Sequence, residues 1–324
     1  MKRRAVVWGA VLAAAMQLVS MSAGAQPSDK PAQLVVGFPP GQSVDIVGRM
    51  LAERLGPALG RNVIVDNKPG QGGSLALGHV ARSPADGSTY TLAALAALVA
   101  NPHLYKNVQY DTLKDFEPIG LVYDAPMVLL VNPSVPVKSV ADLIAHAKQN
   151  PDRLTHSSSG NGTVSHLGMV AFKQRTGITM LHVPYPGSAK ALLDLMSGNV
   201  QVAMETAASA LPHIRSGRLR LLAVCSARRM SVFPDAPTVA ELGFDGFEAV
   251  AWIGLLAPAG LPADLVSKVN AEISTLVRSD DFSNRMLAIG AQPRTSTPAE
   301  FAAYLRAEYR KWGDLVRQSG AKVD

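Results

Sequence analysis

The chain has 324 residues, of which 31 are Lys or Arg and 25 are Asp or Glu, and its formal net charge is +6 at pH 7. This bias is mild and no long basic run supports it, which argues against a nucleic-acid-binding surface and an anionic-membrane-binding surface. The single cysteine, Cys225, excludes an internal disulfide, and its place in the apolar run 221–225 predicts a buried, unreactive thiol.

The first 25 residues carry the pattern of a secretory signal peptide. Basic residues 2–4 precede the apolar run 5–16, and Ala23-Gly24-Ala25 is a sequence that a signal peptidase accepts. An uncleaved anchor is the alternative, but the run is shorter than the roughly 20 residues that a stable span needs. We therefore expect an exported periplasmic protein without stable membrane insertion. Loss of the signal removes three basic residues and lowers the net charge from +6 to +3.

Short apolar runs alternate with helical patterns through the rest of the chain. Strands are expected at 34–38, 63–66, 90–94, 127–131, 154–158, 180–184, 200–204 and 219–224. Helices are expected at 44–55, 74–81, 140–149, 164–176, 189–196, 262–277, 280–289 and 298–318. The alternation predicts an α/β fold with mainly parallel sheets flanked by helices, and the length suits two lobes of about 150 residues each.

Three glycine-rich loops each follow an expected strand and precede an expected helix, at residues 38–45, 69–74 and 157–163. In open parallel sheets, ligands bind beyond the carboxyl ends of the strands, where such loops meet. Glycines let backbone N–H groups approach an anion, and the helix starts add partial positive charge. Each loop alone could equally be a plain turn or a helix cap. Together, the three predict an anion-binding cleft.

Catalytic and metal-binding motifs are missing from the sequence. There is no G-x-x-x-x-G-K-[ST] phosphate loop, no G-x-S-x-G elbow, no H-E-x-x-H and no C-x-x-C. A nucleophile pair could be drawn from Ser157 or Ser159 with His156 or His166, but nothing marks a third orienting residue. An exported Ser/His hydrolase is therefore the alternative to a binding protein, and we expect no cofactor and no metal.

Several stretches resemble one known family, the tripartite tricarboxylate transporter substrate-binding proteins, called TctC or Bug proteins. The resemblance covers nearly the whole mature chain in order. The matching stretches are VGFPPG (36–41) with Asp45, NKPGQGG (67–73), ADGSTY (85–90), SSGNGT (158–163) with His166, HVPY (182–185), VQVAM (200–204), PDAPT (234–238), Trp252 and LLAPAG (255–260).

The resemblance implies a two-lobed periplasmic binding protein of the type II, Venus-flytrap class that is not an enzyme. It implies strands crossing between the lobes near 123–131 and 247–257. The lobes would be residues 26–125 with 250–324, and residues 126–249. Such a receptor captures a small carboxylate, either an organic acid or an amino acid-like anion, for membrane permease subunits, or presents it to a membrane sensor. We expect it to be a monomer.

The resemblance also implies which residues contact the ligand. They are Phe38, Pro39, Pro40, Gly41, Gln42, Ser43, Asp45, Ala94, Ser157, Ser158, Ser159, Gly160, Asn161, Gly162, Thr163, His166, Tyr185, Pro186, Gly187, Glu205 and Thr206. Three departures matter. The family often has Gly-Gly and a Thr before the Asp of the first loop, where this chain has GQSVD (41–45). Glu205 stands where many members have Asp, and residues 93–97 are apolar where a small polar cluster is usual. We therefore expect a carboxylate with an apolar body rather than citrate.

Overall fold

The computed structural model describes residues 30–40 and 43–320. The predicted signal peptide, and Gly41 and Gln42 of the first glycine-rich loop, lie outside the described residues. Within the described ranges, no helix combines the length and apolar character needed to cross a membrane.

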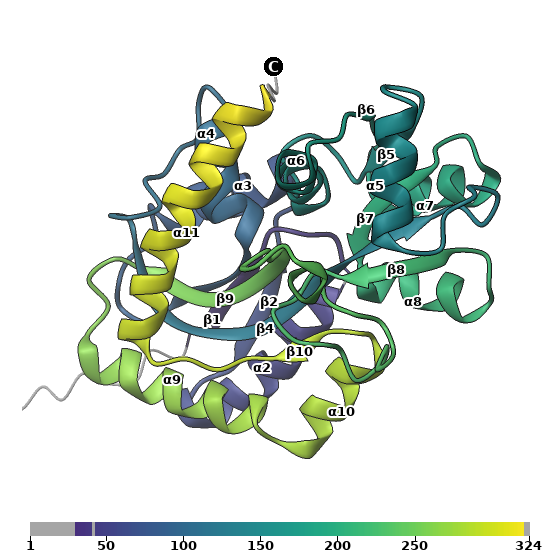
Figure 1. Ribbon diagram of the computed structural model, residues 1–324. Coiled ribbons are helices and arrows are strands. Elements are labelled where there is room, and N and C mark those ends of the chain that lie inside the picture. The colour runs from purple at the N-terminus through teal and green to yellow at the C-terminus, as the bar shows by residue number, and fades with distance from the viewer. Residues whose placement is uncertain (1–29, 41–42, 321–324) are drawn as a thin grey trace, which may run out of the picture.

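Strands and helices alternate along the chain, as the sequence pattern predicts (Figure 1). The strands are β1 (Ala32–Val36), β2 (Val63–Asn67), β3 (Thr89–Ala94), β4 (Phe116–Val131), β5 (Thr155–Ser158), β6 (Leu181–Pro184), β7 (Val202–Thr206), β8 (Arg220–Val224), β9 (Val250–Pro258) and β10 (Gln292–Pro293). The helices are α2 (Ser43–Leu59), α3 (Ser74–Val80), α4 (Asn101–Leu104), α5 (Val140–Gln149), α6 (Val164–Thr176), α7 (Ser188–Ser197), α8 (Ala207–Arg215), α9 (Ala263–Val277), α10 (Asp280–Ala288) and α11 (Pro298–Ser319). Shorter helical turns are η1 (Gln71–Gly73), η2 (Ala96–Ala100) and η3 (Ala240–Leu242). Helix α8 is not among the sequence predictions, and it contains Pro212, a residue that usually ends a helix.

Local sequence signals set several helix ends. Ser139 accepts a hydrogen bond from the backbone N–H of Asp142 and starts α5. Thr297 and Glu300 form a capping box at the start of α11. Gly177, with φ of 64°, ends α6 in the left-handed conformation that glycine adopts without strain. These signals explain why the predicted bounds of these helices match the observed ones closely.

One sheet runs through the molecule in the strand order β2-β1-β3-β9-β4-β7-β5-β6, with β8 and β10 paired to β4 off this path. The outer strands pair in parallel, β1 with β2 and β3, and β5 with β6 and β7. The central strands β4 and β9 run antiparallel to each other and to their neighbours. The sheet is therefore mixed, and the expected parallel pairing holds for the outer strands only. The reason is that the chain leaves the first lobe along β4 and returns along β9 in the opposite direction.

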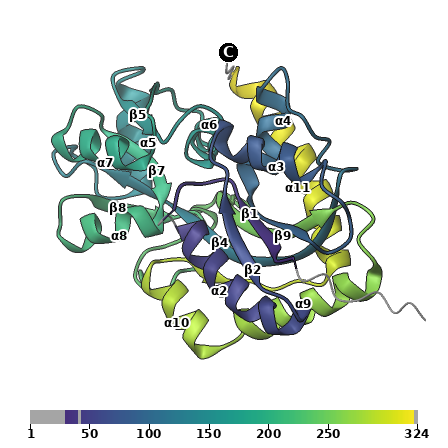
Figure 2. The same ribbon diagram turned by 180° about the vertical axis from the view of Figure 1, so that it is seen from behind.

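Strand β4 connects the two lobes. Its residues 116–126 pair with β9, whereas residues 127–131 pair with β7 and β8. The returning chain crosses beside it at Ala249, whose N–H donates to the carbonyl of Cys225 and whose carbonyl accepts from the N–H of Met127. Figure 2 shows β1, β2, α2 and α3 on one side of this crossing and β5, β7, α5 and α7 on the other. We propose that the lobe boundaries lie at this change of partner, near residues 125 and 250.

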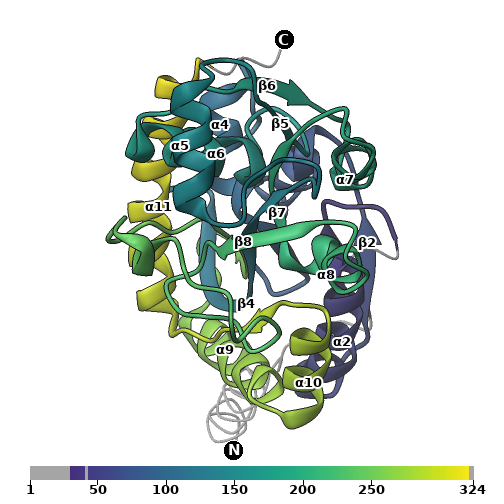
Figure 3. The ribbon, with the colours of Figure 1, turned by 45° about the vertical axis from the view of Figure 1, so that its right-hand side comes forward.

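The lobes share a core along one side of the molecule. Helix α11 packs against α6 of the other lobe (Figure 3). Leu167 of α6 lies in the same buried apolar cluster as Leu305 and Trp312 of α11. The two lobes are therefore packed against each other through α6 and α11.

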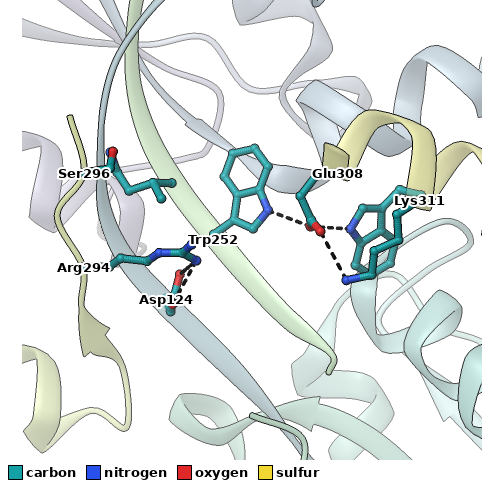
Figure 4. A network of polar contacts seen from close by, with 8 residues as sticks. Asp124, Trp252, Arg294, Ser296, Glu308 and Lys311 are labelled. Atoms are coloured by element: carbon teal, nitrogen blue, oxygen red, sulfur yellow. Dashed lines mark hydrogen bonds and ion pairs between the residues drawn. The ribbon is translucent and has the colours of Figure 1, made fainter. Parts of the chain in front are cut away.

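A network of polar contacts braces the crossing strands (Figure 4). Asp124 of β4 accepts hydrogen bonds from Arg294 at 3.1 and 3.2 Å. On the neighbouring strand, Trp252 donates its Nε1–H to Glu308 at 3.0 Å, and Trp312 donates to the same carboxylate oxygen at 2.7 Å. Burial raises the pKa of Asp124 to about 6, against the opposing effect of the guanidinium. These contacts tie α11 and β10 to the strands where the lobes meet.

Candidate functional site

A groove of about 680 Å³ lies between the two lobes. From the first lobe it is lined by Gly72, Ala96, Asn101 and Tyr105. From the second lobe it is lined by the loops 159–163 and 184–187. None of these residues is charged at neutral pH. An anion in this groove would therefore be held by neutral donors rather than by an ion pair.

Asn101 holds the second glycine-rich loop in place on the first-lobe side. Its Nδ2 donates to the carbonyl of Gln71 and to Oγ of Ser74, both at 2.9 Å. Gly72 has a φ of +60°, and a Cβ there would lie 3.1 Å from Asn101 Nδ2. Only glycine therefore fits without strain. The sequence prediction missed Asn101 because its partners lie about thirty positions earlier in the chain.

Hydrogen bonds of a buried aspartate and an asparagine hold the first glycine-rich loop in place. Asp45 is 2 % exposed and accepts hydrogen bonds from Arg49 at 3.0 Å and from Asn67 at 2.9 Å. The same Asn67 amide donates to the carbonyl of Phe38 at 2.9 Å. Asp45 therefore supports the loop and does not line the groove.

The Ser/Gly loop of the second lobe is shaped by two glycines and capped by a threonine. Gly160 and Gly162 have φ of +132° and +75°. Thr163 is the N-cap of α6: its Oγ1 accepts from the N–H of His166 and donates to the carbonyl of Gly160 at 2.7 Å. The loop therefore presents the start of a thirteen-residue helix to the groove, where backbone N–H groups and the helix dipole favour an anion.

Three imidazoles stack behind this loop. His182 lies 4.0 Å from His166 and 4.8 Å from His156, ring centre to ring centre, with nearly parallel planes. His166 Nδ1 accepts from the N–H of Gly162 at 3.2 Å, and His182 Nε2 lies 2.7 Å from Ser158 Oγ. Burial lowers the pKa of His156 to about 2, of His166 to about 3 and of His182 to about 4. The stack is therefore neutral at physiological pH and supports the loop by packing.

Glu205 lies at the end of β7 with no exposed surface. Its carboxylate accepts hydrogen bonds from Ser188 Oγ at 2.7 Å and from Ser165 Oγ at 3.2 Å. Burial raises its pKa to about 7, although these hydroxyls and the backbone N–H of Thr206 favour the charged form. Glu205 thus stands behind the groove-lining loops.

The third groove-lining segment, residues 184–187, precedes α7. Tyr185 donates its hydroxyl to Asp194 Oδ2 at 2.7 Å, and burial with this contact raises the pKa of Tyr185 to about 12. Gly187 is the N-cap of α7 with φ of 108° and no side-chain cap, so the first N–H groups of α7 lack a capping side chain.

Apart from Gly41 and Gln42, which lie outside the described residues, the predicted site residues fall into three groups. Those that line the groove are Ser159, Gly160, Asn161, Gly162, Thr163, Tyr185, Pro186 and Gly187. Buried residues that support the loops are Asp45, Ser157, Ser158, His166 and Glu205. The rest lie around them: Phe38 and Ala94 line a narrow cavity beside the groove, Pro39 and Pro40 are exposed, Ser43 begins α2, and Thr206 caps α8. The groove also contains Gly72, Ala96 and Pro184, which lie in the predicted stretches 69–74, 93–97 and 182–185, and Asn101 and Tyr105, which the sequence did not single out.

Comparison with known proteins agrees with this architecture. The family model described as the tripartite tricarboxylate transporter family receptor, TctC, matches residues 47–321. The chain belongs to this family. It is 36% identical over 324 residues to protein BugT of Bordetella pertussis, covering 100% of this chain and 99% of BugT. The expected resemblance and the α/β periplasmic binding protein fold are thereby confirmed.

Solved structures of relatives have the same fold. The R. palustris protein Rpa4515, solved with adipate, is 34% identical with a TM-score of 0.79, covering 90% of this chain and 98% of that one. MatC from Rhodopseudomonas palustris, with bound malate, is 29% identical with a TM-score of 0.74, covering 88% and 98%. Periplasmic binding protein BugD is 33% identical with a TM-score of 0.74, covering 90% of this chain and 98% of that one. The family is one of binding proteins and not of enzymes, and the chain is a member of it.

The geometry also disfavours the hydrolase alternative. The hydroxyl of Ser159 donates to Thr163 Oγ1 rather than to an imidazole. Both ring nitrogens of His156 are buried without a hydrogen-bond partner, and Nδ1 of His166 accepts from a backbone N–H. Ser157, the other candidate nucleophile, is fully buried and its Oγ has no hydrogen-bond partner among the described residues. Ser158, which contacts His182, is fully buried as well. None of these serines combines exposure with an activating base.

Proposed function

We propose that this protein is a periplasmic receptor that captures a small carboxylate between its lobes for a tripartite tricarboxylate-type permease. The observation that carries the proposal is the uncharged groove of about 680 Å³ between the lobes. Its donors are backbone N–H groups, hydroxyls and helix starts, which bind carboxylates without a counter-ion and permit release. Adipate and malate in the structures of two relatives support this ligand class.

We assign one end of the ligand to the second lobe. Thr163, the N-cap of α6, and Gly187, the N-cap of α7, both line the groove. The starts of two helices are therefore available to one end of the ligand. The other end lies against Asn101 and Tyr105 of the first lobe, beside the first glycine-rich loop. A ligand that contacts both lobes favours their closure, because its binding free energy is greatest in the closed state.

An apolar residue on the first-lobe side of the groove suggests the body of the ligand. Ala96 lines the groove and belongs to the run 93–97, which contains only alanine and leucine. An apolar wall stabilises hydrocarbon and leaves extra hydroxyl and carboxylate groups unpaired. We therefore propose a linear, branched or aromatic carboxylate rather than citrate. Calorimetric titration with adipate, malate, benzoate and citrate tests this, and selective tight binding of citrate would contradict it.

A matched pair of substitutions tests the placement of the site. Thr163→Asp keeps an N-cap acceptor, which helix starts favour, but adds a negative charge at the groove. Thr163→Asn keeps the cap and the shape without the charge. We expect the Asp variant to bind the best acid of the panel at least about tenfold more weakly than the Asn variant, by charge repulsion. Equal affinities of the two variants would overturn the placement.

A further inference from the structure

Glu205 connects the two groove-lining loops of the second lobe from behind. Ser188 Oγ, at the start of α7, donates to one carboxylate oxygen at 2.7 Å. Ser165 Oγ, in the first turn of α6, donates to the other at 3.2 Å and accepts from the backbone N–H of Ser159 at 3.2 Å. A single hydroxyl therefore separates this carboxylate from the backbone of the Ser/Gly loop.

The carboxylate has no cation to balance it. Among the described residues no Lys, Arg or His makes an ion pair with Glu205, which has no exposed surface. Titratable groups on the elements around it are Glu117, Tyr123 and Asp124 on β4, His156 and His182 on β5 and β6, His166, Lys173 and Arg175 on α6, Lys190 and Asp194 on α7, His213 and Arg215 on α8, and Arg220 on β8. None of them contributes to the shifted pKa of Glu205, which has burial as its leading cause.

Both protonation states of Glu205 can keep their hydrogen bonds. When the carboxyl is ionised, both hydroxyls donate to it. When it is protonated, it can donate to Ser188, whose hydroxyl rotates, while Ser165 still donates to the other oxygen. Ser188 is partly exposed, so a proton can pass between solvent and Glu205 through one hydroxyl. The site is therefore built to gain or lose a proton without unfolding.

We propose that ligand capture is coupled to protonation of Glu205, so that the protein takes up a proton from solvent as it binds a carboxylate. This inference rests on the proposed function, because it requires an anion on the loop 159–163. Such an anion would lie roughly 6–8 Å from Glu205, judged from two successive hydrogen bonds. At that separation in a partly buried site, two negative charges disfavour each other by a factor of roughly ten or more, and one proton removes that penalty.

Calorimetric titration of adipate tests the coupling. At pH 7.5, the measured enthalpy in phosphate and in Tris buffer should differ by the ionisation enthalpy of about half a proton or more. Affinity should fall roughly tenfold between pH 6.5 and pH 9, a range in which adipate is fully or almost fully ionised. The stacked histidines remain neutral throughout this range because their pKa values are about 4 or lower.

Variants separate Glu205 from other titrating groups. Glu205→Gln should bind adipate with no buffer-dependent enthalpy and with a flat pH profile. Ser188→Ala should move the pH midpoint upward, because it removes a donor that favours the charged form. Glu241→Gln, at an exposed glutamate paired with Arg229, is the matched control and should behave as wild type.

The outcomes distinguish the two proposals. Proton uptake that persists in Glu205→Gln, or wild-type binding with neither proton uptake nor pH dependence, would overturn the coupling and leave the receptor function standing. If Glu205→Gln does not fold, an unmoved pH midpoint in Ser188→Ala would overturn the coupling in its place. Failure of the wild type to bind any acid of the panel would instead contradict the proposed function itself.

Discussion

Gly162 of the second lobe packs closely against Leu104 of the first lobe. Its φ is +75°, and a Cβ at this position would lie 1.9 Å from Cδ1 of Leu104 in α4. Gly162→Ala should lower the free energy of unfolding by about 1 kcal/mol for the left-handed backbone. Displacing the buried Leu104 should add about 1–3 kcal/mol, since overpacking forces neighbours to move. We therefore expect a loss of about 2–4 kcal/mol, with weaker binding of the ligand.

Gly177→Ala is the matched control for this substitution. Gly177 is also left-handed, with φ of +64°, but a Cβ added there would have no atom within 4 Å, so only the backbone cost of about 1 kcal/mol applies. Urea unfolding of both variants isolates the contact with Leu104 as the difference between them. If Gly162→Ala is no less stable than Gly177→Ala, the lobes do not pack in this way in solution and the reasoning fails.

Buried groups lead to three more predictions. Burial favours the protonated form of Glu205 in the folded state and raises its pKa to about 7, so the stability that this protonation contributes is present below pH 4.5 and is lost as pH rises through about 7. Between pH 4 and pH 9, the free energy of unfolding of Glu205→Gln should therefore rise by about 3 kcal/mol relative to that of the wild type, as measured by urea unfolding. A difference between the two proteins that does not change with pH would contradict this. Glu308→Ala leaves the indole N–H groups of Trp252 and Trp312 without their acceptor and should destabilise by about 2–4 kcal/mol, with a changed tryptophan emission; unchanged unfolding would refute the bracing role. Cys225 is fully buried with a raised pKa, so a thiol reagent at pH 8 should label it only after denaturation, and rapid native labelling would count against its burial.

Much of the fold could be predicted because its signals are local. Helices such as α5, α6 and α11 begin and end at capping residues, whose hydrogen-bond partners lie only three or four positions away in the sequence. Apolar periodicity placed the outer strands, and the motif order identified the receptor family. Helix α8 was missed because Pro212 within it is ordinarily a sign of a break. The antiparallel pairing of β9 with β4 was not predicted in detail, because its direction depends on where the chain returns, which no short window records.

The sequence by itself determined the family, the alternating architecture and the three loops that end at helix starts, because glycines, caps and apolar spacing act within a few residues. Only the tertiary structure decided which side chains line the groove and which stand behind it. Asn101 reaches Gln71, and Ser188 of α7 meets Glu205 of β7, across intervals set by packing rather than by spacing. Burial then decides the chemistry, since a carboxylate that reads as a ligand contact in the sequence lies, in the folded lobe, behind the loops with its pKa raised to about 7.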